Sequence, residues 1–197
     1  MKFENYRIAF IAISLIGILL FASPTIALFL KAPPGEQFSI IYILGPNHTF
    51  DGIPFDVEAG ITYSVFVGVQ NQMGSPQYYT CYVKLANESE QLPDPILGTV
   101  SPMPALYEYK SFINNGATWE APLTFEVNQL SFSNNISQLS GLTINGIQYP
   151  VNSASAWDSN KTGYYYNIFV ELWLLNSTLG TLQYNSRFVN LILNMTQ

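Results

Sequence analysis

The sequence predicts an all-β protein, an antiparallel β-sandwich preceded by one N-terminal transmembrane helix. Three observations support this: a long uncharged apolar run near the N-terminus, apolar and polar residues that alternate after residue 38, and turn signals at roughly ten-residue intervals. The chain has 197 residues, of which 48% are hydrophobic and 10% charged. This is enough for one core, so we expect one exported domain at residues 38–197 whose surface is covered mainly by neutral polar groups.

Residues 8–30 form the apolar run, which carries no charge between Arg7 and Lys31. A helix of this length reaches roughly 34 Å at about 1.5 Å per residue, enough to cross a hydrocarbon core of about 30 Å. Its many Leu, Ile and Phe residues favour insertion by about 6 kcal/mol. We therefore expect a cytoplasmic N-terminus at residues 1–7, a transmembrane helix at 8–30, and a Pro- and Gly-containing linker at 31–37.

A cleaved secretory signal is the alternative interpretation of the same segment. It would consist of a basic start at Met1–Arg7, an apolar stretch at Ile8–Phe21 and a small-residue cleavage site ending at Ala27. The apolar run continues past that site to Leu30, which favours a retained anchor. Both interpretations export the residues that follow.

Six Asn-x-Ser/Thr sequons follow the apolar run and none precedes it. They begin at Asn47, Asn87, Asn135, Asn160, Asn176 and Asn194. Because this tripeptide is the acceptor for N-linked glycans, the six sites predict a glycoprotein of the cell membrane, single-pass, with an extracellular C-terminal domain. The alternative is that Asn-rich turns produce sequons by chance, since Asn and Ser favour turns for their own reasons.

The strands are expected where apolar residues alternate or run continuously. The expected segments are Phe38–Leu44, Ile61–Gln70, Gln77–Ala86, Tyr107–Phe112, Leu123–Phe132, Leu142–Val151 with a type I′ turn at Asn145-Gly146, Tyr164–Leu175 and Ser186–Met195. The last two are nearly all apolar, which predicts central strands shielded on both faces. The Pro-rich segment 92–106 predicts a loop or an edge, because Pro cannot donate to a ladder.

The segment "GITYSVFVGVQNQMGSPQYYTCYVKL" resembles the core of an uncharacterised archaeal membrane-protein family. In that family a Gly opens a strand that ends in Val-x-Asn and a Tyr-rich strand follows, and Gly60, Val69, Asn71 and Tyr79 match this pattern. The resemblance implies an exported immunoglobulin-like domain of unknown function and no catalytic residues. The chain departs from the pattern at Gln72, where an acidic residue is common, and by having one expected membrane helix where many relatives have several.

The sequence offers little reactive chemistry. Cys81 and His48 are the only residues of their types, so no disulfide or multi-ligand zinc site can form, and the alternation around Cys81 places it in the core. The carboxylates Asp56 and Glu58 could share a strand face, but no third acid stands nearby in the sequence. We expect no metal, no cofactor and no enzymatic activity, and the lack of a basic patch predicts no nucleic acid partner.

Three consecutive tyrosines, Tyr164, Tyr165 and Tyr166, are the candidate ligand-binding residues. Exposed rings could stack on a sugar or a solute, although core packing explains such aromatics equally well. The favoured interpretation is a structural or accessory binding subunit at the cell surface, with the membrane, other cell-surface or membrane-complex proteins and N-linked glycans as partners. The alternatives are a carbohydrate or solute receptor that uses the tyrosines, and a filament subunit, for which no processing motif is found near Arg7.

Overall fold

The computed structural model describes residues 4–29 and 36–196, and the chain divides into two compact units, residues 1–35 and 36–197. The first unit contains helix α1 (Glu4–Phe29), which covers the helix predicted at 8–30 except for its last residue. Leu30 and residues 31–35 of the predicted linker lie outside the described residues. Across the described residues, no helix has the length and apolarity that a membrane span requires.

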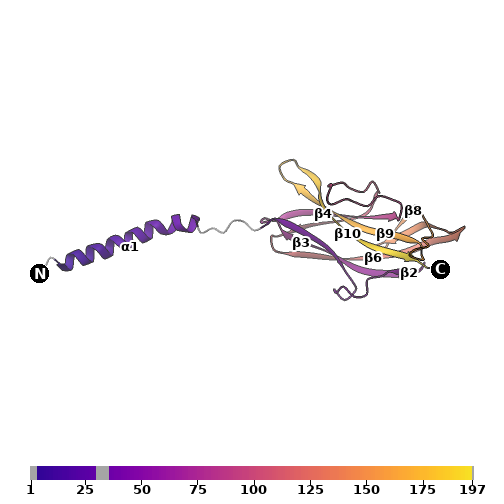
Figure 1. The fold of residues 1–197 in the computed structure, drawn as a ribbon, viewed down its shortest axis with the longest axis horizontal. Coiled ribbons are helices and arrows are strands. Elements are labelled where there is room, and N and C mark those ends of the chain that lie inside the picture. Colours follow the sequence, from indigo (N-terminus) through magenta and orange to yellow (C-terminus); the bar gives the residue numbers. More distant parts are fainter. Residues whose placement is uncertain (1–3, 30–35, 197) are drawn as a thin grey trace. The chain divides into compact units, whose positions relative to one another are not determined.

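The second unit is a sandwich of two five-stranded sheets (Figure 1). Its strands are β1 (Phe38–Leu44), β2 (Asp56–Val57), β3 (Thr62–Gln72), β4 (Gln77–Asn87), β5 (Ala105–Ile113), β6 (Thr118–Ser133), β7 (Ile136–Ile144), β8 (Ile147–Ala156), β9 (Tyr165–Asn176) and β10 (Thr181–Met195). One sheet has the order β1-β3-β6-β7-β8 and the other β2-β10-β9-β4-β5. The predicted β-sandwich is therefore confirmed.

The sequence predicted a wholly antiparallel sandwich, and this is wrong for one strand pair. Strand β2 runs parallel to β10, with Asp56 opposite Asn194 and Val57 opposite Met195. The alternation pattern could not reveal this strand because two residues are too few to show a period. The other pairings are antiparallel.

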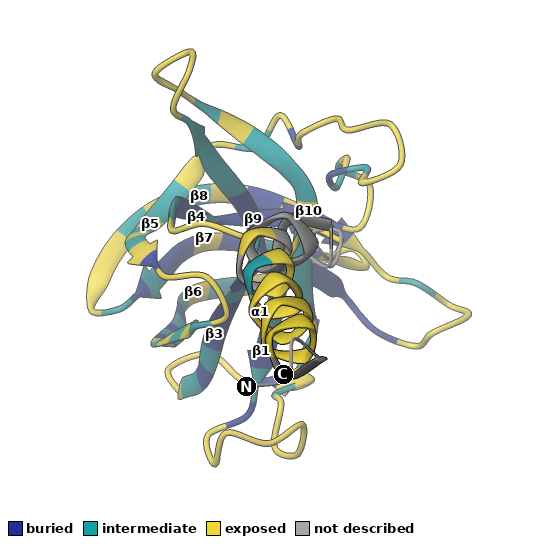
Figure 2. Cartoon of the chain, turned by 90° about the vertical axis from the view of Figure 1, so that its left-hand side faces the viewer, coloured by how far each residue is buried: buried dark blue, intermediate teal, exposed yellow. Residues whose placement is uncertain are grey.

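The core lies between the two sheets and is built from the inward positions of alternating strands. Val65, Val67 and Val69 of β3 and Tyr79 and Val83 of β4 are fully buried. Figure 2 shows that burial is concentrated in the strands and exposure in the turns. The predicted alternation is confirmed in β3. In β4 the inward residues join the core as predicted, but Thr80 and Lys84 on the other face are buried as well.

Strand β9 is buried on both faces over Tyr165–Leu172, as its continuous apolar sequence predicted. The same prediction is wrong for β10, which is half-buried or exposed at most positions. One face of β9 joins the core. The other face is covered in part by the loop at residues 88–104, which returns across β4 and β9 before β5 begins. This Pro-rich segment is a loop, one of the two predicted possibilities.

An ion pair fastens that loop to the sheet. The Lys84 ammonium on β4 lies 2.9 Å from the Glu171 carboxylate on β9, and the two side chains are 8% and 0% exposed. The Ser101 backbone amide donates to Glu171 at 2.8 Å, and Lys84 donates to the Ser101 carbonyl at 3.0 Å. Trp173 adds a further bond from its indole nitrogen to Glu171 at 3.1 Å. All charges and donors in this cluster therefore have partners, as a buried pair requires.

Two hairpin turns of type I′ frame strand β7. The predicted turn at Asn145-Gly146 is confirmed, with φ values of 48° and 78°. A second turn at Asn134-Asn135, with φ values of 51° and 58°, joins β6 to β7 and was not predicted. Asn tolerates this left-handed region better than most residues, which explains both positions.

The side chain of Asn71 joins the two sheets at one end of the sandwich. Its amide nitrogen donates to the carbonyls of Ser75 and Ile113 at 2.9 and 2.8 Å. Its amide oxygen accepts from the Met73 backbone amide at 2.9 Å and from the Tyr79 hydroxyl at 3.1 Å. Because Asn71 is fully buried, these four bonds satisfy a group that would otherwise be costly to bury.

Tyr79 extends this network to strand β1, since its hydroxyl lies 2.8 Å from the Ser39 hydroxyl. The Asn71 backbone also pairs with the turn after β5, through its amide to Ala117 and its carbonyl to Gly116. Asn71 and Tyr79 are two of the residues that carry the family resemblance. Their match therefore reflects a structural network.

Candidate binding surface

Three of the predicted glycan sites have exposed side chains in turns or loops. Asn47 lies in the loop after β1, Asn135 in the β6–β7 turn and Asn160 in the loop before β9. Asn176 is partly exposed at the tip of the β9–β10 hairpin, which projects from the sandwich in Figure 1. Its amide oxygen accepts from the Thr178 and Leu179 backbone amides, the bonds that form the turn.

The other two sites are less accessible, Asn87 because it is buried and Asn194 because its half-buried side chain is bonded within strand β10. Asn87 is 8% exposed, and its amide oxygen accepts bonds from Ser89 and Glu90. The Asn194 amide nitrogen donates to Asp56 at 2.9 Å. The six sites are therefore structurally unequal, a difference that the tripeptide pattern cannot show.

The three consecutive tyrosines are buried, so the prediction of a surface platform at these positions is wrong. Tyr164, Tyr165 and Tyr166 are 8%, 5% and 0% exposed. The Tyr166 hydroxyl bonds to Ser137 across the core at 2.8 Å, and Tyr165 lies on the opposite face beneath Phe55. Both faces of β9 are covered here, which a sequence of consecutive tyrosines does not disclose.

Cys81 and His48 do not form a pair. Cys81 lies in the core as predicted and is 1% exposed, whereas His48 lies on an exposed loop and bonds to Glu120 at 2.8 Å. The paired acids Asp56 and Glu58 stand at β2, and among the described residues no three His, Cys, Asp or Glu side chains are placed to hold a metal ion.

Burial should make the Cys81 thiol unreactive and the fold sensitive to alkali. Burial raises the pKa of the Cys81 thiol to about 12, from about 8.5 for a free cysteine. Above about pH 8.5 the unfolded chain loses this proton while the folded chain keeps it, so stability should fall as the pH rises towards 12. We expect negligible labelling by a thiol reagent at pH 8 until denaturant is added. Cys81→Ala should reduce the alkaline loss of stability, and rapid labelling of the folded protein would contradict the buried position.

Two highly exposed large apolar side chains stand side by side on a short turn within the 88–104 loop. Ile96 is 94% exposed and Leu97 75% exposed. The turn is well bonded: Asp94 and Thr99 exchange two backbone hydrogen bonds of 2.9 and 3.1 Å. The Asp94 carboxylate also accepts from the Ile96 and Leu97 amides at 2.8 and 3.0 Å, and Gly98 supplies a φ of 67°. The turn thus holds two apolar side chains in water on a structured support.

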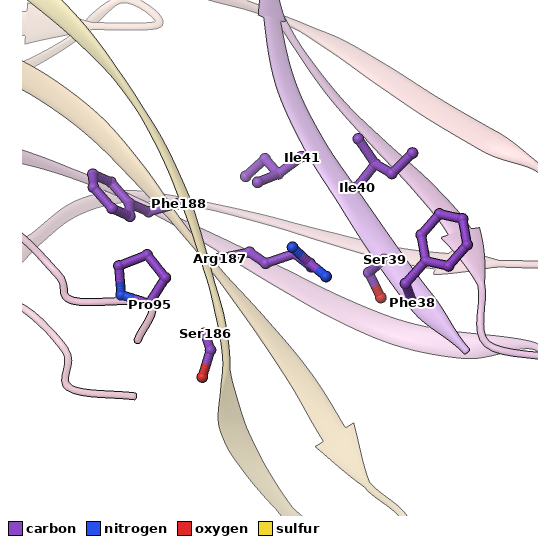
Figure 3. A pocket seen from close by; sticks show the side chains of 8 residues that line it. All are labelled: Phe38, Ser39, Ile40, Ile41, Pro95, Ser186, Arg187 and Phe188. Carbon is purple, nitrogen blue, oxygen red and sulfur yellow. The ribbon is translucent and has the colours of Figure 1, made fainter. Parts of the chain in front are cut away.

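A cleft of about 230 Å³ lies beside this turn, between strands β1 and β10. Figure 3 shows its lining: Phe38, Ser39, Ile40 and Ile41 come from β1, Ser186, Arg187 and Phe188 from β10, and Pro95 from the turn. The cleft is below the roughly 300 Å³ typical of small-molecule sites, so it suits one or two side chains of a partner better than a ligand of drug size.

Arg187 supplies the charge in the cleft and points from β10 towards β1 (Figure 3). Lys84, Lys110 and Lys161 each have a carboxylate partner. Arg187 forms no ion pair or side-chain hydrogen bond with any residue that the structure describes. An unpaired guanidinium at an apolar cleft is suited to a partner that brings a carboxylate.

A larger cleft of about 450 Å³ lies between β8 and the start of the 88–104 loop. Its lining is mostly small and polar: Asn87, Glu88, Ser89, Ile136, Ala154, Ser155 and Ala156. Its one charged side chain, Glu88, is already paired with Lys161. The 94–99 turn together with the β1/β10 cleft is therefore the stronger candidate surface.

One protein-family model matches this chain. The family model described as a domain of unknown function (DUF1616) matches residues 32–139, more than half of the chain. The chain belongs to the DUF1616 family. No curated protein matches the chain.

The DUF1616 match contains the Asn71–Tyr79 network and the 94–99 turn, and it ends within β7. Strand β10, which supplies Arg187 to the cleft, lies beyond it. Sequence reasoning missed the candidate surface because the Pro-rich segment indicated only a loop. The available signal was the pair Ile96-Leu97 between a turn-forming Asp94 and Gly98.

Proposed function

We propose that this DUF1616 protein is a membrane-anchored, N-glycosylated, extracellular immunoglobulin-like β-sandwich that acts as a structural or accessory binding subunit at an archaeal cell surface. The observation that carries the binding role is the 94–99 turn, which keeps Ile96 and Leu97 exposed beside the β1/β10 cleft. Exposed apolar side chains held on a structured turn lower the solubility of a protein. Surfaces of this kind, here next to an unpaired charge, mark interaction sites.

Two observations support the membrane-anchored, extracellular location. Helix α1 exposes large apolar side chains at closely spaced positions such as Ile8, Phe10, Ile11 and Ile13, so its apolar surface extends around the helix. An apolar surface of this kind is typical of helices that are buried in protein or in a membrane. The six sequons follow it, and several of them are open to an enzyme.

Co-purification tests the binding role. The full chain, extracted from its native membranes in mild detergent, should retain partner chains that the double variant Ile96→Ser/Leu97→Ser loses. Ile147→Ser is the control, because Ile147 is an exposed apolar side chain that lies at the β7–β8 hairpin. Loss of the same chains from both variants, or from neither, would count against this surface.

Glycan mapping tests the placement. We expect carbohydrate at Asn47, Asn135 and Asn160, whose side chains are exposed, and at Asn176, which lies at a hairpin tip. We expect none at Asn87, which is buried, or at Asn194, which lies within strand β10 and is bonded to Asp56 and to the Tyr164 amide. Mass spectrometry of peptides from the native protein would measure the occupancy of each site.

Two results of the glycan mapping would contradict these expectations. Absence of carbohydrate at every site, with protection of residues 36–197 from protease added to intact cells, would remove the extracellular placement. Occupancy at Asn194 would show that modification precedes formation of its bond to Asp56.

A further inference from the structure

The side of the sandwich that carries the β1/β10 cleft has a second apolar patch towards its other end. Phe50 is 77% exposed, and Ile53, Phe55 and Ile192 are also exposed. The Asn194 amide donates to the Phe55 carbonyl at 2.7 Å, so this loop lies against the C-terminal part of β10. We call these four residues the loop patch, and the side formed by β1, β2 and β10 the flank.

Acidic side chains lie next to the loop patch. Asp51 lies in the loop, and Asp56 and Glu58 lie at strand β2, which follows it; none of the three forms an ion pair with a described residue. The cleft, by contrast, contains the unpaired Arg187. The cleft end therefore carries one unpaired cation, Arg187, beside Asp94, whose carboxylate is bonded to the turn amides, whereas the other end carries three acids and no described cation.

Strand β10 connects the two ends, and its edge between them is unpaired, with β1 close to the part that lines the cleft. Strand β2 pairs with β10 at Asn194 and Met195 only, and no described strand pairs with this edge from Arg187 to Leu193. Arg187 and Leu193 lie equally far from Asn190 along the strand. A two-fold axis near Asn190 would place the cleft of one copy on the loop patch of the other, in both directions at once.

We propose that the flank is a self-complementary interface through which two copies of the chain pair about a two-fold axis near Asn190. The two β10 strands run antiparallel, so Phe188 of one copy faces Ile192 of the other. Ile96 and Leu97 pack against the loop patch, and Arg187 approaches the Asp56 carboxylate of the other copy. The proposal rests on the proposed binding role and names its partner.

Disulfide cross-linking of the purified full chain tests the symmetry. A single cysteine on a two-fold axis meets its own copy, so Asn190→Cys should give a covalent dimer under mild oxidation. The native Cys81 is buried and should not react. Asn152→Cys is the control, because Asn152 is exposed on β8 and away from the flank. A covalent dimer from Asn190→Cys with monomer from Asn152→Cys supports the proposal, whereas monomer from both or equal dimer from both overturns it.

Charge exchange tests the contact between the two ends. Arg187→Glu should weaken the dimer by at least about tenfold, since like charges then meet across the interface. Adding Asp56→Lys to that variant should restore the dimer, measured by sedimentation equilibrium, with melting curves to verify that each variant folds. Loss without restoration in folded variants overturns the pairing.

These results separate the dimer from the broader binding role. If the purified chain is a monomer while other proteins still depend on Ile96 and Leu97 for co-purification, the two-fold pairing is wrong and the binding role stands. If the dimer forms but no other protein depends on those residues, the flank is a self-association surface alone.

Discussion

Replacing Glu171 with Ala should destabilise the sandwich by about 3–5 kcal/mol, the cost of leaving one member of a buried ion pair without its partner. Lys84 is 8% exposed and would keep only the Ser101 carbonyl as a bonding partner. The Ser101 backbone amide and the Trp173 indole nitrogen would also lose their acceptor. Chemical denaturation followed by tryptophan fluorescence would measure the change.

Two controls distinguish the ion pair from packing. Glu108→Ala removes an exposed carboxylate whose partner is Lys110, and it should change stability by less than about 1 kcal/mol. The double variant Lys84→Met/Glu171→Leu removes both charges and should lose less than Glu171→Ala alone. If Glu171→Ala cost no more than Glu108→Ala, the pair would have to be hydrated and the 88–104 loop open.

Asn71→Ala should be comparably severe, with a loss of about 3 kcal/mol or more, because it orphans several buried groups at once. The carbonyl of Ile113, the amide of Met73 and the hydroxyl of Tyr79 would each lose a partner. The β3–β4 turn should also loosen, since Asn71 bonds to Ser75 within it. The denaturation midpoint would report the first effect and hydrogen exchange of the turn amides the second.

Asn152→Ala is the matched control for this substitution. The Asn152 side chain is exposed and its amide oxygen accepts one bond, from Gln138. We expect a change within about 0.5 kcal/mol, as is usual for surface substitutions. Equal effects at Asn71 and Asn152 would rule out a joining role for Asn71.

The positions of most strands could be predicted because inward side chains in a half-buried strand recur every second residue. Strands β3 and β4 show this directly, with Val65, Val67 and Val69 in one and Tyr79 and Cys81 in the other. Strand β2 and the first half of β7 were missed. Strand β2 has two residues, too few to show an alternation of apolar and polar side chains. Strand β7 begins with "ISQLSG", in which small and polar residues weaken the alternation.

The candidate surface depends on proximity between segments that are far apart in the chain. Pro95 and Arg187 line the same cleft, although more than ninety positions separate them. Nothing in either local sequence indicates the other. The same holds for Lys84 and Glu171, whose partnership requires β4 and β9 to be neighbours.

The sequence by itself determined the local properties of this protein: the apolar N-terminal helix, the alternating strands, the Asn145-Gly146 turn and the six sequons. These follow from neighbouring residues, because backbone preferences and side-chain periodicity act over a few positions. Tertiary structure alone decided which sequons are open, that the tyrosines of β9 are buried, and that an apolar turn meets an unpaired arginine. Burial and charge pairing depend on which strands become neighbours, and that is set by the packing of the whole chain.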